Sequence, residues 1–143
     1  MELPESNRAA RVVNKMLEKD TYGRWLGSSI EKIEEGYCLM KIKVRSEFMN
    51  GVGTLHGGVI FGIADVAFAY ASNSHNRMAV ALDVSISFPN AGYEGDELTA
   101  EAKEIYLGGK TAIYQVTITN QHKKLLALFN GTVFRTEKKY FEE

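Results

Sequence analysis

One carboxylate, that of Asp65, stands within a run of apolar and small residues that extends from Val59 to about Ser74. The length of this run and its many alanines favour a buried helix over a strand. An ionised carboxylate that is buried without partners is unstable, so such a residue is normally paired, kept neutral or retained for chemistry. The pattern alone equally allows Asp65 to face solvent or to make a structural hydrogen bond.

The triplet His56-Gly57-Gly58 directly precedes this predicted helix. Glycines at the start of a helix leave backbone N–H groups uncovered, and these groups together with the helix dipole favour negative charge. Such a site could hold a carbonyl oxygen that becomes an oxyanion. An ordinary glycine-rich turn with His56 as the cap explains the same residues, so the triplet is a weak signal by itself.

Other chemistries find little support in the sequence. The three histidines have no metal-ligand spacing and no accompanying cysteine or carboxylate cluster, so we expect no metal site. No G-x-S-x-G motif is present for a serine nucleophile. The single cysteine, Cys38, cannot form an intrachain disulfide, and we expect it to be a small core residue on its strand.

Length and composition set broader limits. The 143 residues fit one domain, which we expect to span residues 1–143. Seventeen Lys and Arg against eighteen Asp and Glu give a net charge of -1, which argues against nucleic acid or an anionic membrane as the main partner. No apolar run reaches the ~20 residues of a membrane-spanning helix and no secretory signal is visible, so we expect a cytoplasmic protein.

The periodicity of apolar residues predicts the elements that must position Asp65 and the triplet. A helix is expected over 7–19, within an N-terminal helical segment bounded at 1–22, with Asn7 or Ser6 as its cap. The charged residues 137–143 are expected to form a solvated tail. Strands are expected over 28–34, 37–44, 80–88, 97–107, 111–119 and 124–135. One long helix and these strands describe an α+β domain in which an antiparallel sheet packs against the helix.

A wider set of residues adds a family resemblance. Asn50, the triplet at 56–58 and the segment from Asp65 to Ser74 are joined by matching stretches at 95–102, 109–112 and 131–132. Over roughly residues 45 to 136 the chain resembles the hotdog-fold acyl-CoA thioesterases, in particular the phenylacetate-pathway (PaaI-type) branch of the hydroxybenzoyl-CoA thioesterase superfamily. The resemblance implies a long central helix wrapped by an antiparallel sheet of five to six strands, in agreement with the periodicity.

The resemblance also implies an activity, which is hydrolysis of an acyl-CoA to a carboxylic acid and CoA without a cofactor, an aryl- or arylacetyl-CoA being slightly favoured. By position, Asp65 would be the general base or nucleophile, and the Gly57 N–H would polarise the thioester carbonyl. Asn50 and His56 would position substrate or water and support the loop. Contacts to the substrate or to CoA are expected at Gly58, Gly109, Lys110 and Thr111.

Two positions depart from the family pattern. Some branches carry a hydroxyl residue one turn after the acid, where this chain has Ala69, so a water-orienting hydroxyl is absent there. Lys110 stands where arginine is common, which keeps the charge but removes the bidentate fork for phosphate.

The spacing of the two proposed catalytic groups predicts a dimer. Gly57 and Asp65 are eight residues apart, which is ~12 Å along one helix. An oxyanion donor must lie ~2.7–3.1 Å from the carbonyl oxygen, and a base must lie ~2.6–3.2 Å from the attacking water. Gly57 and Asp65 of a single helix are therefore too far apart to act on the same carbonyl group. Two antiparallel helices related by a twofold axis fit it well. We therefore expect a homodimer with shared sites, which the resemblance extends to a homotetramer.

Two other functions stay open at this point. An acyl-thioester dehydratase or hydratase can use the same fold, although those relatives place their catalytic histidine and acid differently. A non-catalytic acyl-CoA-binding module would tolerate loss of the carboxylate, so the presence of Asp65 beside the triplet counts modestly against it.

Overall fold

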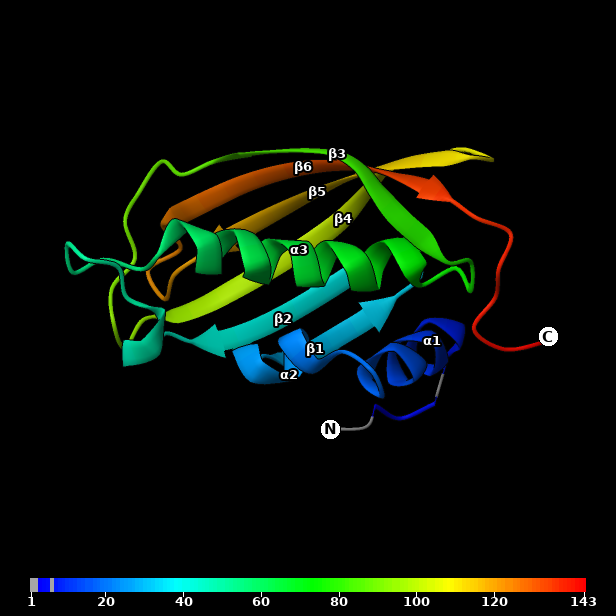
Figure 1. Cartoon of the computed structure of the whole chain (residues 1–143), viewed down its shortest axis with the longest axis horizontal. Helices are drawn as coiled ribbons and strands as arrows, with labels where there is room; N and C mark the ends of the chain where they lie inside the picture. Colours follow the sequence, from blue (N-terminus) through cyan, green and yellow to red (C-terminus); the bar gives the residue numbers. More distant parts are fainter. Residues whose placement is uncertain (1–2, 6) are drawn as a thin grey trace.

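The computed structural model describes residues 3–5 and 7–143. In chain order its elements are α1 (Arg8–Leu17), α2 (Thr21–Leu26), β1 (Ser29–Glu34), β2 (Tyr37–Lys43), the short 3-10 turn η1 (Ser46–Phe48), α3 (Gly57–Asn73), β3 (Ala79–Ser87), β4 (Glu97–Leu107), β5 (Thr111–Thr119) and β6 (Leu125–Arg135). The sheet curves around α3, while α1 and α2 lie beside β1 (Figure 1). The expected α+β architecture is confirmed, with every predicted strand present within two residues of its predicted ends.

The sheet has the strand order β1-β2-β4-β5-β6-β3, and every neighbouring pair is antiparallel. The β4–β5–β6 meander follows from the turns at 108–110 and 120–124. The chain reaches β3 directly from α3, and β3 then pairs with β6 at the far edge of the sheet. This topology leaves β3 as an edge strand whose outer backbone groups have no partner among the described strands.

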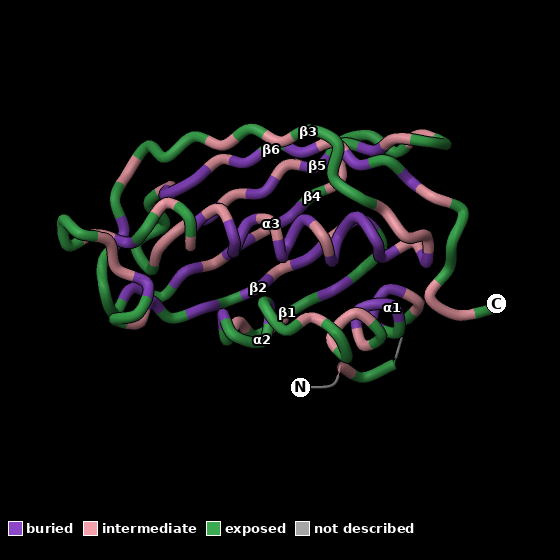
Figure 2. The backbone as a smooth tube through the Cα atoms, viewed as in Figure 1, coloured by how far each residue is buried: buried purple, intermediate pink, exposed green. Residues whose placement is uncertain are grey.

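Helix α3 supplies the centre of the core, as Figure 2 shows by its largely buried course. Small residues such as Ala67 and Ala71 are fully buried and let the sheet approach the helix closely. The Phe68 ring packs against the rings of Phe129 and Tyr114, at centroid distances of 5.2 and 6.0 Å. A Cβ atom on Gly131 of β6 would lie 2.6 Å from this Phe68 ring, so the close approach requires glycine there.

The N-terminal segment differs from the single helix that the periodicity predicts. Helix α1 ends at Leu17, and the Asn7 side chain caps it by accepting a hydrogen bond from the Ala10 N–H at 2.8 Å. The alternative cap, Ser6, lies outside the described residues. A second helix, α2, then starts because the Asp20 carboxylate accepts a hydrogen bond from the Gly23 N–H at 2.9 Å. Six residues are too few to show a helical period, so α2 was not predicted.

The prediction of a solvated tail is wrong for part of residues 137–143. The Tyr140 hydroxyl donates a hydrogen bond to the Asn73 side-chain oxygen at 2.5 Å. The Asn76 side chain donates to the Phe141 carbonyl at 2.9 Å, and the Arg11 guanidinium lies 3.9 Å from the Phe141 ring centroid. Two aromatic residues among the charges therefore fix the tail against the end of α3 and against α1.

The expectation for Cys38 is confirmed. Its side chain is fully buried on β2, and burial raises the pKa of the thiol to about 12. No helix that the structure describes combines the length and the apolar character needed to cross a membrane.

Candidate active site

Helix α3 begins at Gly57, whose backbone N–H has no hydrogen-bond acceptor among the described residues. The Nδ1 atom of His56 accepts a hydrogen bond from the Gly58 N–H at 2.8 Å, so His56 is the cap. The next two N–H groups, of Val59 and Ile60, donate to the His56 carbonyl. The Gly57 N–H donates to no residue that the structure describes. An unused donor at the positive end of a 17-residue helix is suited to an oxyanion.

The loop before α3 is held in place by Asn50. Its side-chain oxygen accepts hydrogen bonds from the N–H groups of Val52 and Thr54, both at 3.0 Å, and its amide nitrogen donates to the Thr54 hydroxyl at 2.8 Å. The His56 N–H donates to the Phe48 carbonyl at 2.9 Å. Asn50 therefore shapes the loop that delivers His56 and Gly57 to the helix.

Asp65 lies on a stripe of α3 that is not buried, together with Gly57, Gly58, Phe61 and Ala69. Its carboxylate makes no hydrogen bond or ion pair with any described residue, so the structural hydrogen bond considered above is not formed. Partial burial raises the pKa of the Asp65 carboxyl group above its ordinary value. A half-buried, unpaired carboxylate on a helix is unfavourable for stability, and such perturbed groups concentrate at functional sites.

Two apolar groups lie about one turn before Asp65 on α3. Phe61 belongs to the same stripe, with its ring 5.6 Å from that of Phe129. Gly62 lies on the buried side, and the Tyr22 side chain of α2 covers it so closely that a Cβ on Gly62 would meet the Tyr22 oxygen. Apolar groups this near along the helix favour desolvation of the Asp65 carboxylate. No sequence signal identifies Tyr22, because it comes from the short helix α2.

The residues expected to contact CoA fall into two groups. Gly58 lies at the start of α3, next to the cap. Gly109 and Lys110 form the β4–β5 turn and Thr111 begins β5. In Figure 1 this hairpin extends at the end of the molecule opposite the start of α3. One protomer therefore does not bring 109–111 to its own Gly57.

The β4–β5 hairpin borders a basic pocket of about 660 Å³. Arg77 donates to the Gly109 carbonyl at 2.9 Å, and Arg135 donates to the Gly108 carbonyl at 2.7 Å. Burial and then the charge of Arg77 lower the pKa of Arg135. The pocket is lined by Arg77, Lys110, Arg135 and Lys139 together with Gly109, Phe134, Thr136 and Glu137.

None of these four cations forms an ion pair of 4.0 Å or less within the described part of the chain. A bound anion would relieve the repulsion between Arg77 and Arg135, so the pocket suits a phosphate. Lys110 was predicted from the sequence, whereas the two arginines were not. Both arginines lie more than 20 residues from Lys110 in the sequence and belong to no motif. The four cations therefore come together only in the folded chain.

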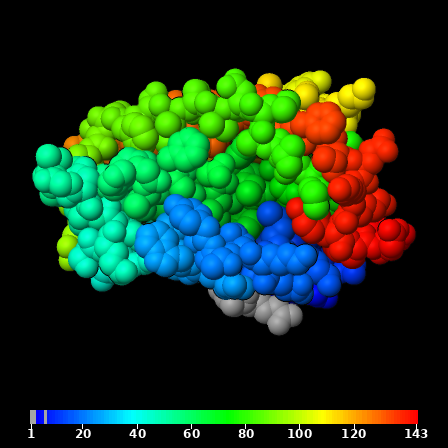
Figure 3. All heavy atoms as spheres, in the orientation of Figure 1, coloured from blue at the N-terminus to red at the C-terminus, as the bar shows by residue number. Residues whose placement is uncertain are grey.

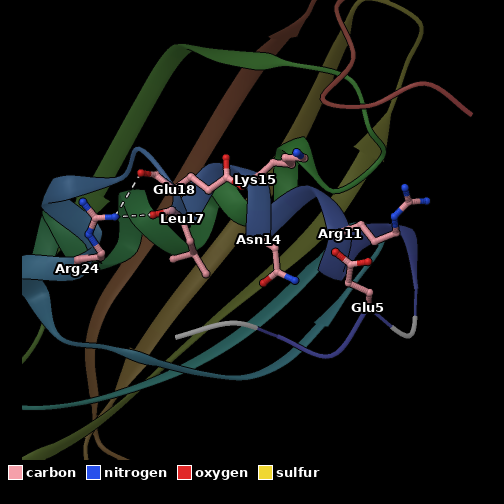
Figure 4. A pocket seen from close by; sticks show the side chains of 7 residues that line it. All are labelled: Glu5, Arg11, Asn14, Lys15, Leu17, Glu18 and Arg24. Atoms are coloured by element: carbon pink, nitrogen blue, oxygen red, sulfur yellow. Dashed lines mark hydrogen bonds between the residues drawn. The ribbon is translucent and has the colours of Figure 1, made fainter.

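Other polar clusters and pockets lack the same features. Within residues 3–5 and 7–143 no three His, Cys, Asp or Glu side chains are grouped to hold a metal ion. His75 instead pairs with Glu104 at 2.7 Å, and the Tyr114 hydroxyl donates to the same Glu104 oxygen at 2.7 Å. A pocket of about 390 Å³ beside α1 and α2 contains none of the candidate site residues (Figure 4). There Arg24 donates to the carbonyls of Leu17 and Glu18.

Comparison with known proteins identifies relatives over most of the chain. A family model described as Thioesterase superfamily matches residues 52–127. The acyl-coenzyme A thioesterase PaaI of Escherichia coli is 38% identical over 130 residues, which cover 91% of this chain and 93% of that protein. A structure of E. coli PaaI, described as coming from the phenylacetic acid degradation operon, matches with a TM-score of 0.90 and 37% identity, covering 95% of this chain and 99% of that one.

A second solved structure carries a ligand. A Streptococcus mutans protein bound to acetyl-CoA matches with a TM-score of 0.76 and 31% identity, covering 78% of this chain and 90% of that one. The expected hotdog fold is confirmed by these neighbours.

Proposed function

Since the chain belongs to the thioesterase superfamily, we propose that it hydrolyses acyl-CoA thioesters to the free carboxylic acid and CoA. The observation that carries the proposal is the pair of unused groups on α3, the unpaired carboxylate of Asp65 and the free N–H of Gly57. A base and an oxyanion donor are the two parts that thioester hydrolysis by water requires.

In the proposed reaction Asp65 is the general base. It removes a proton from a water molecule, the water oxygen attacks the thioester carbonyl carbon, and the carbonyl oxygen becomes an oxyanion. The Gly57 N–H donates to this oxyanion. The carbon–sulfur bond then breaks, and CoA leaves as a thiolate that takes up a proton. A carboxyl pKa raised by burial makes Asp65 a better proton acceptor than an ordinary aspartate, as the proposed general base requires.

We propose that Gly57 and Asp65 of one site come from two copies of the chain. The separation of eight residues along α3 makes a site within one protomer unfavourable. The edge strand β3 supports a twofold partner, because it exposes backbone groups and the side chains of Val80 and Leu82, which are 50% and 59% exposed. Pairing of β3 with its copy would continue the sheet and place the two α3 helices side by side.

A tetramer made from two such dimers is part of the same proposal. The outer face of the sheet carries the exposed apolar side chains of Tyr106, Ile113 and Phe134. Tyr106 pairs directly with Ile113 across β4 and β5, so their side chains share that face. A second apolar surface of this kind suits the association of dimers.

For the CoA portion of the substrate we propose the basic pocket at the β4–β5 hairpin. Its four cations suit the phosphates of the nucleotide, and Gly109, Lys110 and Thr111 lie in or beside it. An aryl or arylacetyl acyl group is the proposed preference, supported by the phenylacetic acid operon named for the E. coli structure. Asn50 and His56 act in the proposal by holding the loop and the start of α3.

The test is release of free thiol from a panel of acyl-CoAs by the wild-type protein and by Asp65→Asn. We expect turnover by the wild type and a loss of about 10²–10⁴-fold in kcat for the variant. Turnover that survives in both Asp65→Asn and Asp65→Ala would overturn the role of Asp65. A lack of turnover with every acyl-CoA would favour the binding module instead.

Thermal unfolding checks that Asp65→Asn is still folded. Burial raises the pKa of Asp65 in the folded chain, so the stability that this group contributes is present at low pH and is lost as the pH rises through the raised pKa. Asparagine does not ionise and escapes this loss. The variant should therefore have a Tm at pH 7 no lower than that of the wild type, while its activity falls.

A further inference from the structure

A row of aromatic rings from α2 and η1 ends at Gly62 of α3, three residues before Asp65. The Tyr22 and Trp25 rings are stacked with centroids 6.0 Å apart, and Trp25 contacts the Phe48 ring at 5.6 Å. The Arg45 guanidinium lies over the rings of Trp25 and Phe48, at 4.8 and 4.0 Å from their centroids. It also donates to the carbonyls of Trp25 and Leu26 at 2.6 and 2.8 Å. Trp25, on which Tyr22 stacks, is therefore held in one position by several independent contacts.

The Tyr22 end of this row reaches the helix that carries Asp65. The Tyr22 hydroxyl occupies the place of a side chain at Gly62. Gly62 is three residues before Asp65, and positions three apart are neighbours on one helix face. Side chains on a helix lean towards its N-terminus, so the Asp65 carboxylate covers the turn that contains Gly62. Tyr22 and Asp65 thus border the same part of the α3 surface.

This part of the surface is open to solvent. Tyr22 and Trp25 are each 47% exposed, although they are large aromatic side chains. No hydrogen bond joins the Tyr22 hydroxyl to another residue within the described ranges. Figure 3 shows the blue surface of α2 adjoining the green surface of α3 on the visible face of the molecule. A rigid, half-exposed aromatic wall beside the proposed base suits contact with a flat apolar group.

We propose that Tyr22 is a specificity-determining residue whose ring, backed by Trp25, forms one wall of the acyl site and selects aromatic acyl groups. The inference rests on the proposed function, because the thioester carbonyl must lie at Asp65 for the acyl group to reach Tyr22. The ring is the selecting part, since the hydroxyl faces the backbone of Gly62. Aromatic acyl groups gain from stacking on such a ring, whereas short aliphatic acyl groups have little surface to place there.

The experiment compares kcat/KM for phenylacetyl-CoA and butyryl-CoA in the wild type, Tyr22→Ala and Tyr22→Phe. Tyr22→Ala should lose about tenfold with phenylacetyl-CoA, mostly through KM, and less than about threefold with butyryl-CoA. Tyr22→Phe keeps the ring and should stay within about threefold of the wild type with both substrates. Tyr93→Ala is the matched control, because Tyr93 is also exposed, at 55%, and belongs to neither proposed site.

A second variant, Gly62→Ala, changes the position of the Tyr22 ring without changing Tyr22 itself. In Gly62→Ala the new methyl group would displace the Tyr22 ring, so the same selective loss is expected. Adding Gly62→Ala to Tyr22→Ala should cost little more, because the ring that it displaces is already gone.

The outcomes separate this inference from the proposed function. Equal losses with both thioesters, or none in Tyr22→Ala, would overturn the role of Tyr22 while leaving the hydrolase intact. If the wild type hydrolysed no thioester, the proposed function would fail and the role of Tyr22 would fail with it.

Discussion

The Nδ1 atom of His56 accepts the N–H of Gly58 at 2.8 Å, one residue after the free N–H of Gly57. Only an imidazole with an unprotonated Nδ1 can accept this bond, so the neutral ring carries its proton on Nε2. The cap therefore uses the second donor of α3 and leaves the first available. His56 fixes the direction of the helix start without occupying the position proposed for the oxyanion.

Replacing Gly57 by proline tests the oxyanion donor directly. Proline lacks the N–H but is favoured at the first position of a helix. The ψ angle of 131° at His56 suits a residue that precedes proline. We expect Gly57→Pro to keep the Tm close to that of the wild type and to lower kcat by about 10²–10³-fold.

Gly57→Ala is the control for this variant, because it adds a side chain and keeps the N–H. Its methyl group would meet the Phe88 ring at an ordinary contact distance of 3.7 Å. Gly57→Ala should therefore retain much more activity than Gly57→Pro. Wild-type kcat in folded Gly57→Pro would rule out this N–H as the donor.

Mixing two inactive variants tests the shared site. Asp65→Ala supplies an intact Gly57, and Gly57→Pro supplies an intact Asp65. In a freely exchanging equimolar mixture half of the dimers are hybrids with one complete site each, so about a quarter of wild-type activity should return. Subunit exchange is checked by mass spectrometry of differently tagged chains. Exchange without recovered activity would contradict the arrangement across protomers.

The pH dependence of kcat/KM should report the environment of Asp65. The proposed reaction needs the carboxylate, so activity falls as the pH drops below the pKa of Asp65. Burial raises this pKa, which moves the acid limb of the profile above that of a free aspartate at about 3.9. A rate profile measured on one alkyl thioester checks this. An acid limb at or below the ordinary aspartate value would contradict a desolvated base.

Lys110 should matter only for substrates that carry phosphates. Lys110→Ala removes one of four cations from the hairpin pocket, and we expect KM for an acyl-CoA to rise by about tenfold with little change in kcat. The matching N-acetylcysteamine thioester has no phosphate, so its kinetics should not change. Lys43→Ala, at the exposed end of β2, is the control for loss of a positive charge. An equal effect on both thioesters would argue against phosphate binding.

The sequence predicted the helices and strands whose apolar residues recur with a helical or strand period, and it did not predict those that are too short to show one. Alternation placed β2 and β5 correctly, and the apolar run after His56 placed α3, because burial on one face or all around leaves a direct trace in the order of residues. The six residues of α2 leave no such trace. Their helix depends on the Asp20 cap and on packing of Tyr22 and Trp25 against distant residues.

The candidate site divides in the same way. Asp65 and the 56–58 triplet are close in sequence and were predicted from it. Arg77 and Arg135 meet at the hairpin only because β3 pairs with β6, which no local pattern encodes. For residues 137–143 the charged residues predicted a solvated tail, whereas Tyr140 and Phe141 make contacts with Asn73 and Arg11.

The burial of Cys38 has a practical consequence for every kinetic experiment above. Reagents that measure released CoA react with thiolates, and any reactive thiol of the protein would add to the signal. The only cysteine of the chain is fully buried, and its pKa of about 12 keeps it protonated at neutral pH. The native protein should therefore not react with such reagents, so the colour that develops measures released CoA alone. A contribution from Cys38 is expected only if the chain unfolds.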